Sequence, residues 1–190
     1  MSLRVNETTW EAKDEGPIVG SENRLADIRI LIVDDNWFAR SVLRNALQAL
    51  GLWKIVESTC PEDALDKFRE QTFDLILMDN EMPDMSGVEF TKLIRNADRI
   101  VDPTIPIVMV SSCAQLGQIK TATNAGITEF LAKPFTANAL IGKIIACFDA
   151  PRPFICNATY VGPCRRRRDR VSPDNVAFER RAYSAPVHLT

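Results

Sequence analysis

The chain has 190 residues, of which 46% are hydrophobic and 25% are charged, and its formal net charge is −2. This composition is typical of a soluble globular protein, and the length suits one ordinary domain with extensions. No apolar run is long enough to cross a membrane, and the first residues lack the apolar segment of a secretion signal. We therefore expect a cytoplasmic protein without a membrane span.

The charge is distributed unevenly along the chain. Residues 1–150 carry a net charge of −7, whereas residues 151–190 hold eight arginines and a net charge of +5. The sequence predicts three parts: a polar N-terminal extension over 1–26, one domain over 27–149, and an Arg-rich C-terminal arm over 150–190.

Apolar runs and helical stripes alternate through the middle of the chain. Continuous apolar runs are typical of strands buried on both faces, and residues repeating every three or four positions are typical of amphipathic helices. The patterns predict, in chain order, strand 29–33, helix 36–50, strand 52–57, a helix starting near 59–63, strand 74–78, helix 86–97, strand 106–110, helix 114–125, strand 128–132 and helix 136–149. Five strands alternating with five helices predict a parallel sheet covered on both faces, with right-handed crossovers.

Polar groups stand at the C-terminal ends of the apolar runs. Asp34-Asp35 follow the first strand, Asp79 the third, Ser111 the fourth and Lys133 the fifth. The C-terminal ends of parallel strands lie side by side, where open α/β folds bind ligands. Three carboxylates, a hydroxyl and an ammonium in one pocket suit a divalent cation and a phosphoryl group.

This order of residues, ending in Lys133-Pro134, resembles the receiver domain of two-component response regulators. The resemblance covers about residues 27–149. It implies a flavodoxin-like fold with a five-stranded parallel sheet of order 2-1-3-4-5.

The chemistry of the acidic residues agrees with this resemblance. The Asp79 carboxylate can attack phosphorus and hold the phosphoryl group as a mixed anhydride; the alternative is a carboxylate that only caps the next helix. Asp34 and Asp35 repel Asp79 unless a cation neutralises them, and Mg²⁺ suits such oxygen ligands. The resemblance implies that Asp35 and Asp79 bind Mg²⁺ directly, Asp34 directly or through water, and Glu81 through its backbone carbonyl.

Three further residues complete the expected switch. The Ser111 hydroxyl can donate a hydrogen bond to the phosphoryl group, or can cap the next helix instead. The Lys133 ammonium supplies a positive charge, and the resemblance suggests a cis bond to Pro134. The resemblance implies that Phe130 turns inward when Ser111 moves; the alternative is a ring packed permanently in its strand.

The C-terminal arm holds large apolar residues, among them Phe154 and Tyr160, beside the arginine run 165–168. These apolar groups are too few to fold alone, so we expect the arm to pack on a receiver surface, that of a partner subunit in a homodimer. The alternatives are docking on the same subunit and salt-sensitive, non-specific binding of nucleic acid, which the acidic domain opposes.

The sequence as a whole predicts a stand-alone response regulator rather than an enzyme. A histidine kinase or histidine phosphotransfer protein would supply the phosphoryl group, and the output would be binding of a downstream protein through helix 114–125, strand 128–132 and helix 136–149. The alternatives are a nucleic-acid-binding regulator acting through the arm and a scaffold that no longer accepts phosphate.

Overall fold

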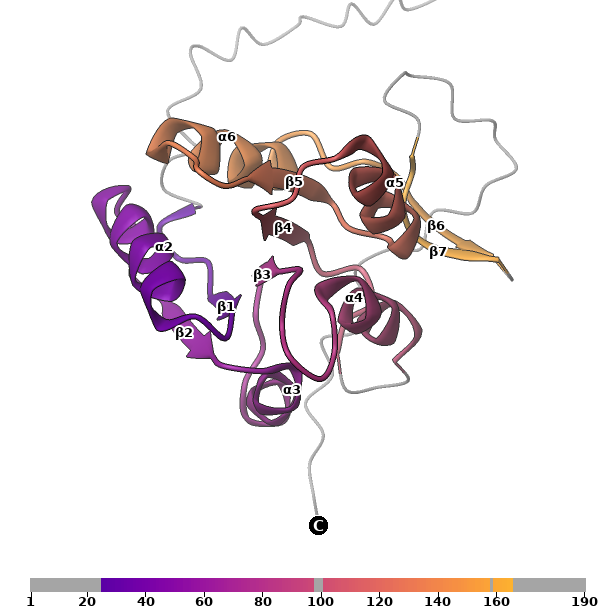
Figure 1. Ribbon diagram of the computed structural model, residues 1–190, viewed down its shortest axis with the longest axis horizontal. Coiled ribbons are helices and arrows are strands. Elements are labelled where there is room, and N and C mark those ends of the chain that lie inside the picture. The colour runs from indigo at the N-terminus through magenta and orange to yellow at the C-terminus, as the bar shows by residue number, and fades with distance from the viewer. Residues whose placement is uncertain (1–24, 98–100, 158, 166–190) are drawn as a thin grey trace, which may run out of the picture.

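The computed structural model describes residues 25–97, 101–157 and 159–165. Its main sheet has five parallel strands in the order β2-β1-β3-β4-β5, which confirms the predicted topology (Figure 1). The strands are β1 (Ile30–Val33), β2 (Ile55–Ser58), β3 (Leu75–Asp79), β4 (Ile107–Ser111) and β5 (Glu129–Ala132).

Five helices alternate with these strands, as the hydrophobic pattern predicts. They are α2 (Trp37–Ala49), α3 (Pro61–Glu70), α4 (Gly87–Asn96), α5 (Leu116–Ala125) and α6 (Ala137–Phe148). Side-chain caps fix where several of them begin. Asn36 accepts hydrogen bonds from two amides of α2, and Ser86 and Glu89 form a reciprocal capping box at α4. Such caps satisfy amides that have no partner within the helix.

The sheet separates two hydrophobic cores, because neighbouring residues of a strand point to opposite faces. In β1, Leu31 and Val33 belong to the core that also contains Phe68 and Phe90 of α3 and α4. Ile30 and Ile32 join the opposite core, beneath α2 and α6. Burial on both faces explains the continuously apolar strands.

The strand register brings the polar residues that follow the apolar runs to one edge. Val33 lies opposite Met78, so Asp34 and Asp79 occupy equivalent positions at the ends of β1 and β3. Asp79 lies opposite Val110, immediately before Ser111. The register therefore places Asp34, Asp79 and Ser111 at the same end of the sheet.

A hairpin that we did not predict as regular structure follows α6. It consists of β6 (Phe154–Asn157) and β7 (Tyr160–Pro163), which pair antiparallel outside the main sheet. The Asn157 side chain closes the turn by accepting hydrogen bonds from the amides of Thr159 and Tyr160. The hairpin lies beside α4 and α5, with β7 in contact with both helices (Figure 1).

The hairpin covers a buried arginine. Arg95 of α4 is 3% exposed and donates hydrogen bonds to the carbonyls of Pro103, Ile105 and Gly126. The Phe154 ring lies 5.5 Å from its guanidinium carbon, a favourable cation–π arrangement. Burial lowers the pKa of Arg95 to about 9, which still leaves it charged at neutral pH. The charge is thus held by carbonyl dipoles and an aromatic face.

Glycine permits the close approach of β7 to the domain. Gly162 has φ of +156°, and a Cβ there would lie 2.7 Å from the Cα of Gly126. No side chain fits in that space without displacing the backbone. The hairpin therefore packs closely on the C-terminal end of α5, where Gly126 is the C-cap.

The packing of the arm is intramolecular in this structure. The described residues 151–157 and 159–165 pack on their own chain, which is one of the alternatives that the sequence left open. The homodimer remains a prediction. The expectations for residues 1–24 and 166–190, including three of the four consecutive arginines, lie outside the described residues.

We expect Tyr160→Ala to destabilise the protein by about 2 kcal/mol, less than the ~3–5 kcal/mol usual for loss of a buried aromatic, because the hairpin is peripheral. Tyr160 is 8% exposed, and its hydroxyl donates to the carbonyl of Pro163. The matched change Arg165→Ala removes an exposed contact with Asn124 and the stacking on Tyr160, and should cost less than about 1 kcal/mol. Urea unfolding measures both, and equal stability of the Tyr160 variant and the wild type would contradict this packing.

In the described part of the chain, no helix is both long and apolar enough to cross a membrane.

Candidate functional site

Two buried carboxylates and one ammonium meet at the C-terminal edge of the sheet. Lys133 Nζ lies 2.7 Å from Asp79 Oδ1 and 3.0 Å from Asp34 Oδ2. Asp34 is 1% exposed and Asp79 5% exposed. The three residues come from the ends of three different strands, β1, β3 and β5, so the parallel topology alone brings them together.

The charges in this cluster depend on one another. Burial raises the pKa of Asp34, and this effect exceeds the opposing effects of its hydrogen bonds with Lys133 and the amide of Asn36. Burial also disfavours the charged form of Lys133, but hydrogen bonds with Asp79 and Asp34 more than compensate, and the pKa of Lys133 rises. The Lys133 ammonium therefore forms ion pairs with two carboxylates, Asp34 and Asp79, and its one positive charge does not neutralise both.

The backbone around Asp79 is fixed on both sides. Asp79 Oδ2 accepts a hydrogen bond from the amide of Glu81, and the carbonyl of Asn80 accepts one from the amide of Gly87. A Cβ at Gly87 would lie 2.3 Å from the carbonyl oxygen of Asp79, so only glycine allows α4 to begin so close to β3. The carboxylate is held at a defined position with Oδ1 directed to Lys133.

Asp35 does not join the buried pair. Its residue is exposed, and within the described residues no three acidic, histidine or cysteine side chains form a ready cluster for a metal ion. Of the three carboxylates expected in one pocket, the structure brings together Asp34 and Asp79, with Lys133 between them. The assignment of Asp35 and of the Glu81 carbonyl as metal ligands stays a prediction.

The donor set nevertheless fits Mg²⁺. All candidate ligands are oxygens, and the two buried carboxylates already converge on a cationic group. Mg²⁺ keeps several waters and needs only one or two protein carboxylates, so a preformed three-carboxylate cage is not required.

Ser111 is fully buried at the end of β4, and its Oγ accepts a hydrogen bond from the amide of Cys113. Its carbonyl accepts a hydrogen bond from the amide of Lys133, which ties the ends of β4 and β5 together. Helix α5 begins after Gln115, so Ser111 does not act as its cap. The hydroxyl therefore lies at the last residue of β4 and contacts the loop that follows this strand.

Phe130 is partly buried and packs against the core shared with α3 and α4. Both alternatives that the sequence left open for Phe130, a ring that turns inward and a permanently packed ring, stay predictions. The bond between Lys133 and Pro134 is cis, as the resemblance suggested.

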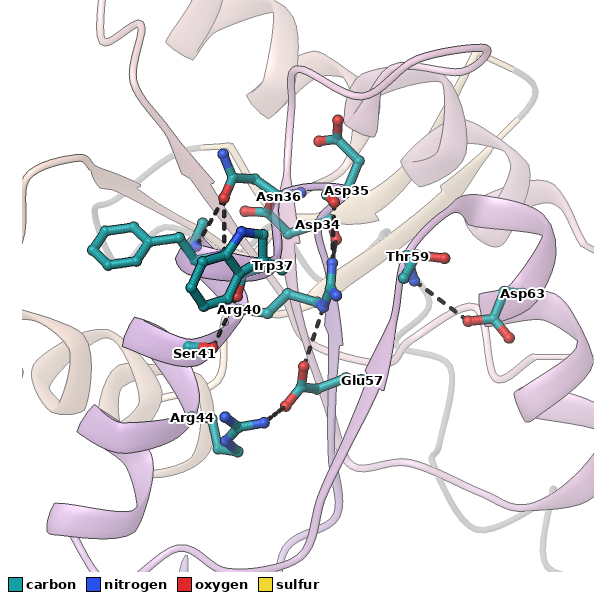
Figure 2. A network of polar contacts seen from close by, with 12 residues as sticks. Asp34, Asp35, Asn36, Trp37, Arg40, Ser41, Arg44, Glu57, Thr59 and Asp63 are labelled. Atoms are coloured by element: carbon teal, nitrogen blue, oxygen red, sulfur yellow. Dashed lines mark hydrogen bonds and ion pairs between the residues drawn. The ribbon is translucent and has the colours of Figure 1, made fainter.

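The sequence analysis did not identify the arginine that contacts the segment Asp34-Asp35, which we call the acidic loop. Arg40, in the second turn of α2, donates hydrogen bonds to the carbonyls of both Asp34 and Asp35, and it pairs with Glu57 of β2 (Figure 2). An arginine five residues after an acidic pair reads as a surface residue of a helix. Its contacts depend on how α2 packs over β1 and β2, which periodicity alone does not specify.

Comparisons with known proteins agree with this fold. Residues 30–145 match the family model of the response regulator receiver domain, and the chain therefore belongs to this family. It is 34% identical over 122 residues to the chemotaxis protein CheY of Pseudomonas aeruginosa, which covers 64% of this chain and 97% of the relative. CheY of Bacillus subtilis is also 34% identical, over 116 residues that cover 61% and 93% of the two chains.

Solved structures give the same result. The chemotaxis protein CheY4 of Vibrio cholerae matches with a TM-score of 0.56 and 28% identity, over 62% of this chain and 95% of its own. The receiver domain of a sensor histidine kinase from Pseudomonas aeruginosa matches with a TM-score of 0.54 and 28% identity, over 63% and 94%. That receiver domain is described with a magnesium ion coordinated in its active-site cleft.

We expect Asp34→Asn to stabilise the metal-free protein at neutral pH. Burial raises the pKa of Asp34, so ionisation of this carboxyl costs the folded state free energy at any pH above that raised pKa. The cost disappears as the pH falls below the ordinary value of 3.8, where the carboxyl is protonated in both the folded and unfolded states. The gain should therefore be largest near pH 7 and shrink on acidification.

Urea unfolding in EDTA at several pH values measures this gain. Asp27→Asn is the matched control, because the hydrogen bond with Lys54 lowers the pKa of Asp27 and its substitution should give no gain at neutral pH. Equal or lower stability of Asp34→Asn at pH 7 would contradict the account of the cluster.

Proposed function

We propose that this protein is a phosphorylation-controlled response regulator whose phosphoacceptor is Asp79. The observation that carries the proposal is the convergence of buried Asp34 and Asp79 on Lys133 at the C-terminal edge of the sheet. Family membership supports a role in two-component signalling.

The residues present suit each part of phosphoryl transfer. An Asp79 oxygen attacks phosphorus as a nucleophile, and the bond from phosphorus to the donor breaks. Mg²⁺, when bound by Asp34, Asp35, Asp79 and the Glu81 carbonyl, would neutralise charge on the carboxylates and on the phosphoryl oxygens. Lys133 would contact a phosphoryl oxygen, a role supported by the contact of its ammonium with the Asp79 carboxylate.

The proposed output is a change in protein binding. Ser111 would donate its hydroxyl hydrogen to the phosphoryl group while its Oγ still accepts from the amide of Cys113. A shift of Ser111 toward the phosphoryl group would therefore move the loop after β4 with it. A histidine kinase or histidine phosphotransfer protein would supply the phosphoryl group. A downstream protein would bind the surface of α5, β5 and α6, where Leu116 is 86% exposed. The protein would catalyse only its own phosphorylation and dephosphorylation. It would act in the cytoplasm.

Nucleic-acid binding through the arm is the weaker candidate. Arg165, the first of the four consecutive arginines, is engaged with Asn124 and stacks 4.3 Å from the Tyr160 ring. Its charge is therefore used in packing the hairpin, while the remainder of the domain is acidic.

Intact mass spectrometry tests the proposal. The full-length protein is incubated with acetyl phosphate, with and without Mg²⁺, and weighed. We expect an adduct of one phosphoryl group that forms in Mg²⁺ and does not form when EDTA is present from the start. An adduct that forms equally well in EDTA, or no adduct under conditions in which a known receiver is labelled, would contradict the proposal.

A further inference from the structure

Arg40 joins three segments of the chain with one guanidinium group. Its Nη1 donates to the carbonyl of Asp34 at 2.7 Å and to that of Asp35 at 3.1 Å. Its Nε donates to Glu57 Oε2 at 3.1 Å. Figure 2 shows the guanidinium below the acidic loop, with the Asp35 carboxylate pointing away from it.

The two carbonyls lie where the sheet no longer fixes the backbone. Strand β1 ends at Val33, and the amide of Asp34 still donates to the carbonyl of Ser58 on β2. Beyond this bond the chain leaves the sheet to enter α2. The hydrogen bonds from Arg40 therefore hold the two successive peptide groups that carry the acidic side chains.

The direction of a peptide group determines where the adjoining side chains point. With its carbonyl held by Arg40, Asp34 directs one oxygen to Lys133 and the other to the amide of Asn36. Asp35, the next residue, points its carboxylate to the solvent side of the same edge. Rotation of the peptide between Asp34 and Asp35 would redirect both carboxylates, and rotation of the next peptide would redirect that of Asp35.

Arg40 is itself fixed by a partly buried ion pair. Its side chain is 13% exposed and that of Glu57 is 25% exposed. Glu57 also pairs with Arg44, one helical turn further along α2, but Arg44 does not contact the acidic loop in the described structure. The Glu57 carboxylate both orients the Arg40 guanidinium and offsets its charge.

We propose that Arg40 is a positioning residue for the metal site, a backbone clamp that presents Asp34 and Asp35 to a divalent cation. The inference rests on the proposed function, since it assigns how the acidic pair is held ready for Mg²⁺. Arg40 itself touches neither the metal nor the phosphoryl group.

Two effects of Arg40 on Mg²⁺ binding oppose each other. Its positive charge disfavours a nearby cation, whereas its hydrogen bonds hold the ligands in place. Pairing with Glu57 weakens the first effect and leaves the second intact. Loss of residues that orient metal ligands typically costs 10–100-fold in metal affinity, and we expect about 10-fold here because Arg40 acts through the backbone.

The variants Arg40→Lys and Arg40→Met separate geometry from charge. Lysine keeps the positive charge but cannot donate to two carbonyls and Glu57 in the same arrangement. Arg44→Met is the matched control, because it removes the other arginine of the Glu57 pair and leaves the loop contacts in place.

Mg²⁺ binding is measured by isothermal titration calorimetry on full-length proteins, and unfolding in EDTA is measured in parallel. We expect Arg40→Lys and Arg40→Met to bind Mg²⁺ about 10-fold more weakly than the wild type, and Arg44→Met to bind as the wild type does. A purely structural role would lower the stability in EDTA without changing the Mg²⁺ affinity of the folded protein.

Unchanged affinity in both Arg40 variants overturns the inference, as does tighter binding by Arg40→Met with unchanged binding by Arg40→Lys, which would make charge the dominant effect. These outcomes leave the proposed function intact if the wild type binds Mg²⁺. A wild-type protein that binds no Mg²⁺ overturns both.

Discussion

Asp79→Asn is expected to abolish phosphoryl uptake while leaving the fold intact. The amide has nearly the shape of the carboxylate, but it lacks the charged oxygen that attacks phosphorus. Asp79 is 5% exposed and already contacts Lys133, so substitution also removes one of the two carboxylates that share this ammonium. Labelling with acetyl phosphate in Mg²⁺, followed by intact mass measurement, checks the result.

Asp66→Asn is the matched control for that experiment. Asp66 is exposed on α3 and, among the described residues, forms an ion pair with Arg69 of the same helix, so its loss should leave labelling unchanged. Uptake by Asp79→Asn equal to that of the control would show that another residue accepts the phosphoryl group.

Lys133→Met should destabilise the metal-free protein by about 2–3 kcal/mol, and Mg²⁺ should restore much of this loss. Removing one partner of a buried ion pair leaves the other charge uncompensated, which typically costs 3–5 kcal/mol; Lys133 is 21% exposed, so we expect a smaller cost. Here Asp34 and Asp79 would remain together without a cation. A ligand that binds only the folded state stabilises it by mass action, and the variant offers Mg²⁺ a site without a competing ammonium.

Urea unfolding with EDTA and with saturating Mg²⁺ measures both effects. Lys143→Met removes a comparable ion pair with Glu129, which begins β5 at the end of the strand opposite to Lys133. We expect Mg²⁺ to stabilise Lys133→Met more than it stabilises the wild type or the Lys143 variant. An equal response in all three would contradict the view that Lys133 and a metal ion neutralise the same carboxylates.

The sequence predicted the fold because each strand carries a complete local signal. The run Leu75–Asp79 is apolar because it is buried on both faces, and the polar residue that ends it marks the sheet edge. Asp34, Asp79 and Lys133 were found by the same reasoning, because a parallel sheet brings strand ends together without help from side chains.

The remaining features depend on tertiary packing. The hairpin has short apolar runs and a turn asparagine at Asn157. These signals are too weak to predict strands in a tail without a core of its own. Arg95 reads as a surface residue of α4 until Phe154 covers it. The outward position of Asp35 follows from peptide directions at the end of β1, which no hydrophobic pattern encodes.

The most direct measurement locates the phosphoryl group. Borohydride reduces an aspartyl phosphate to an alcohol, which converts the modified aspartate to homoserine, and tandem mass spectrometry of the digested protein identifies the position. After labelling in Mg²⁺, we expect homoserine at position 79 alone, and none when Mg²⁺ is chelated. Homoserine at Asp34 or Asp35, or at any position in place of Asp79, would contradict the assignment of the phosphoacceptor.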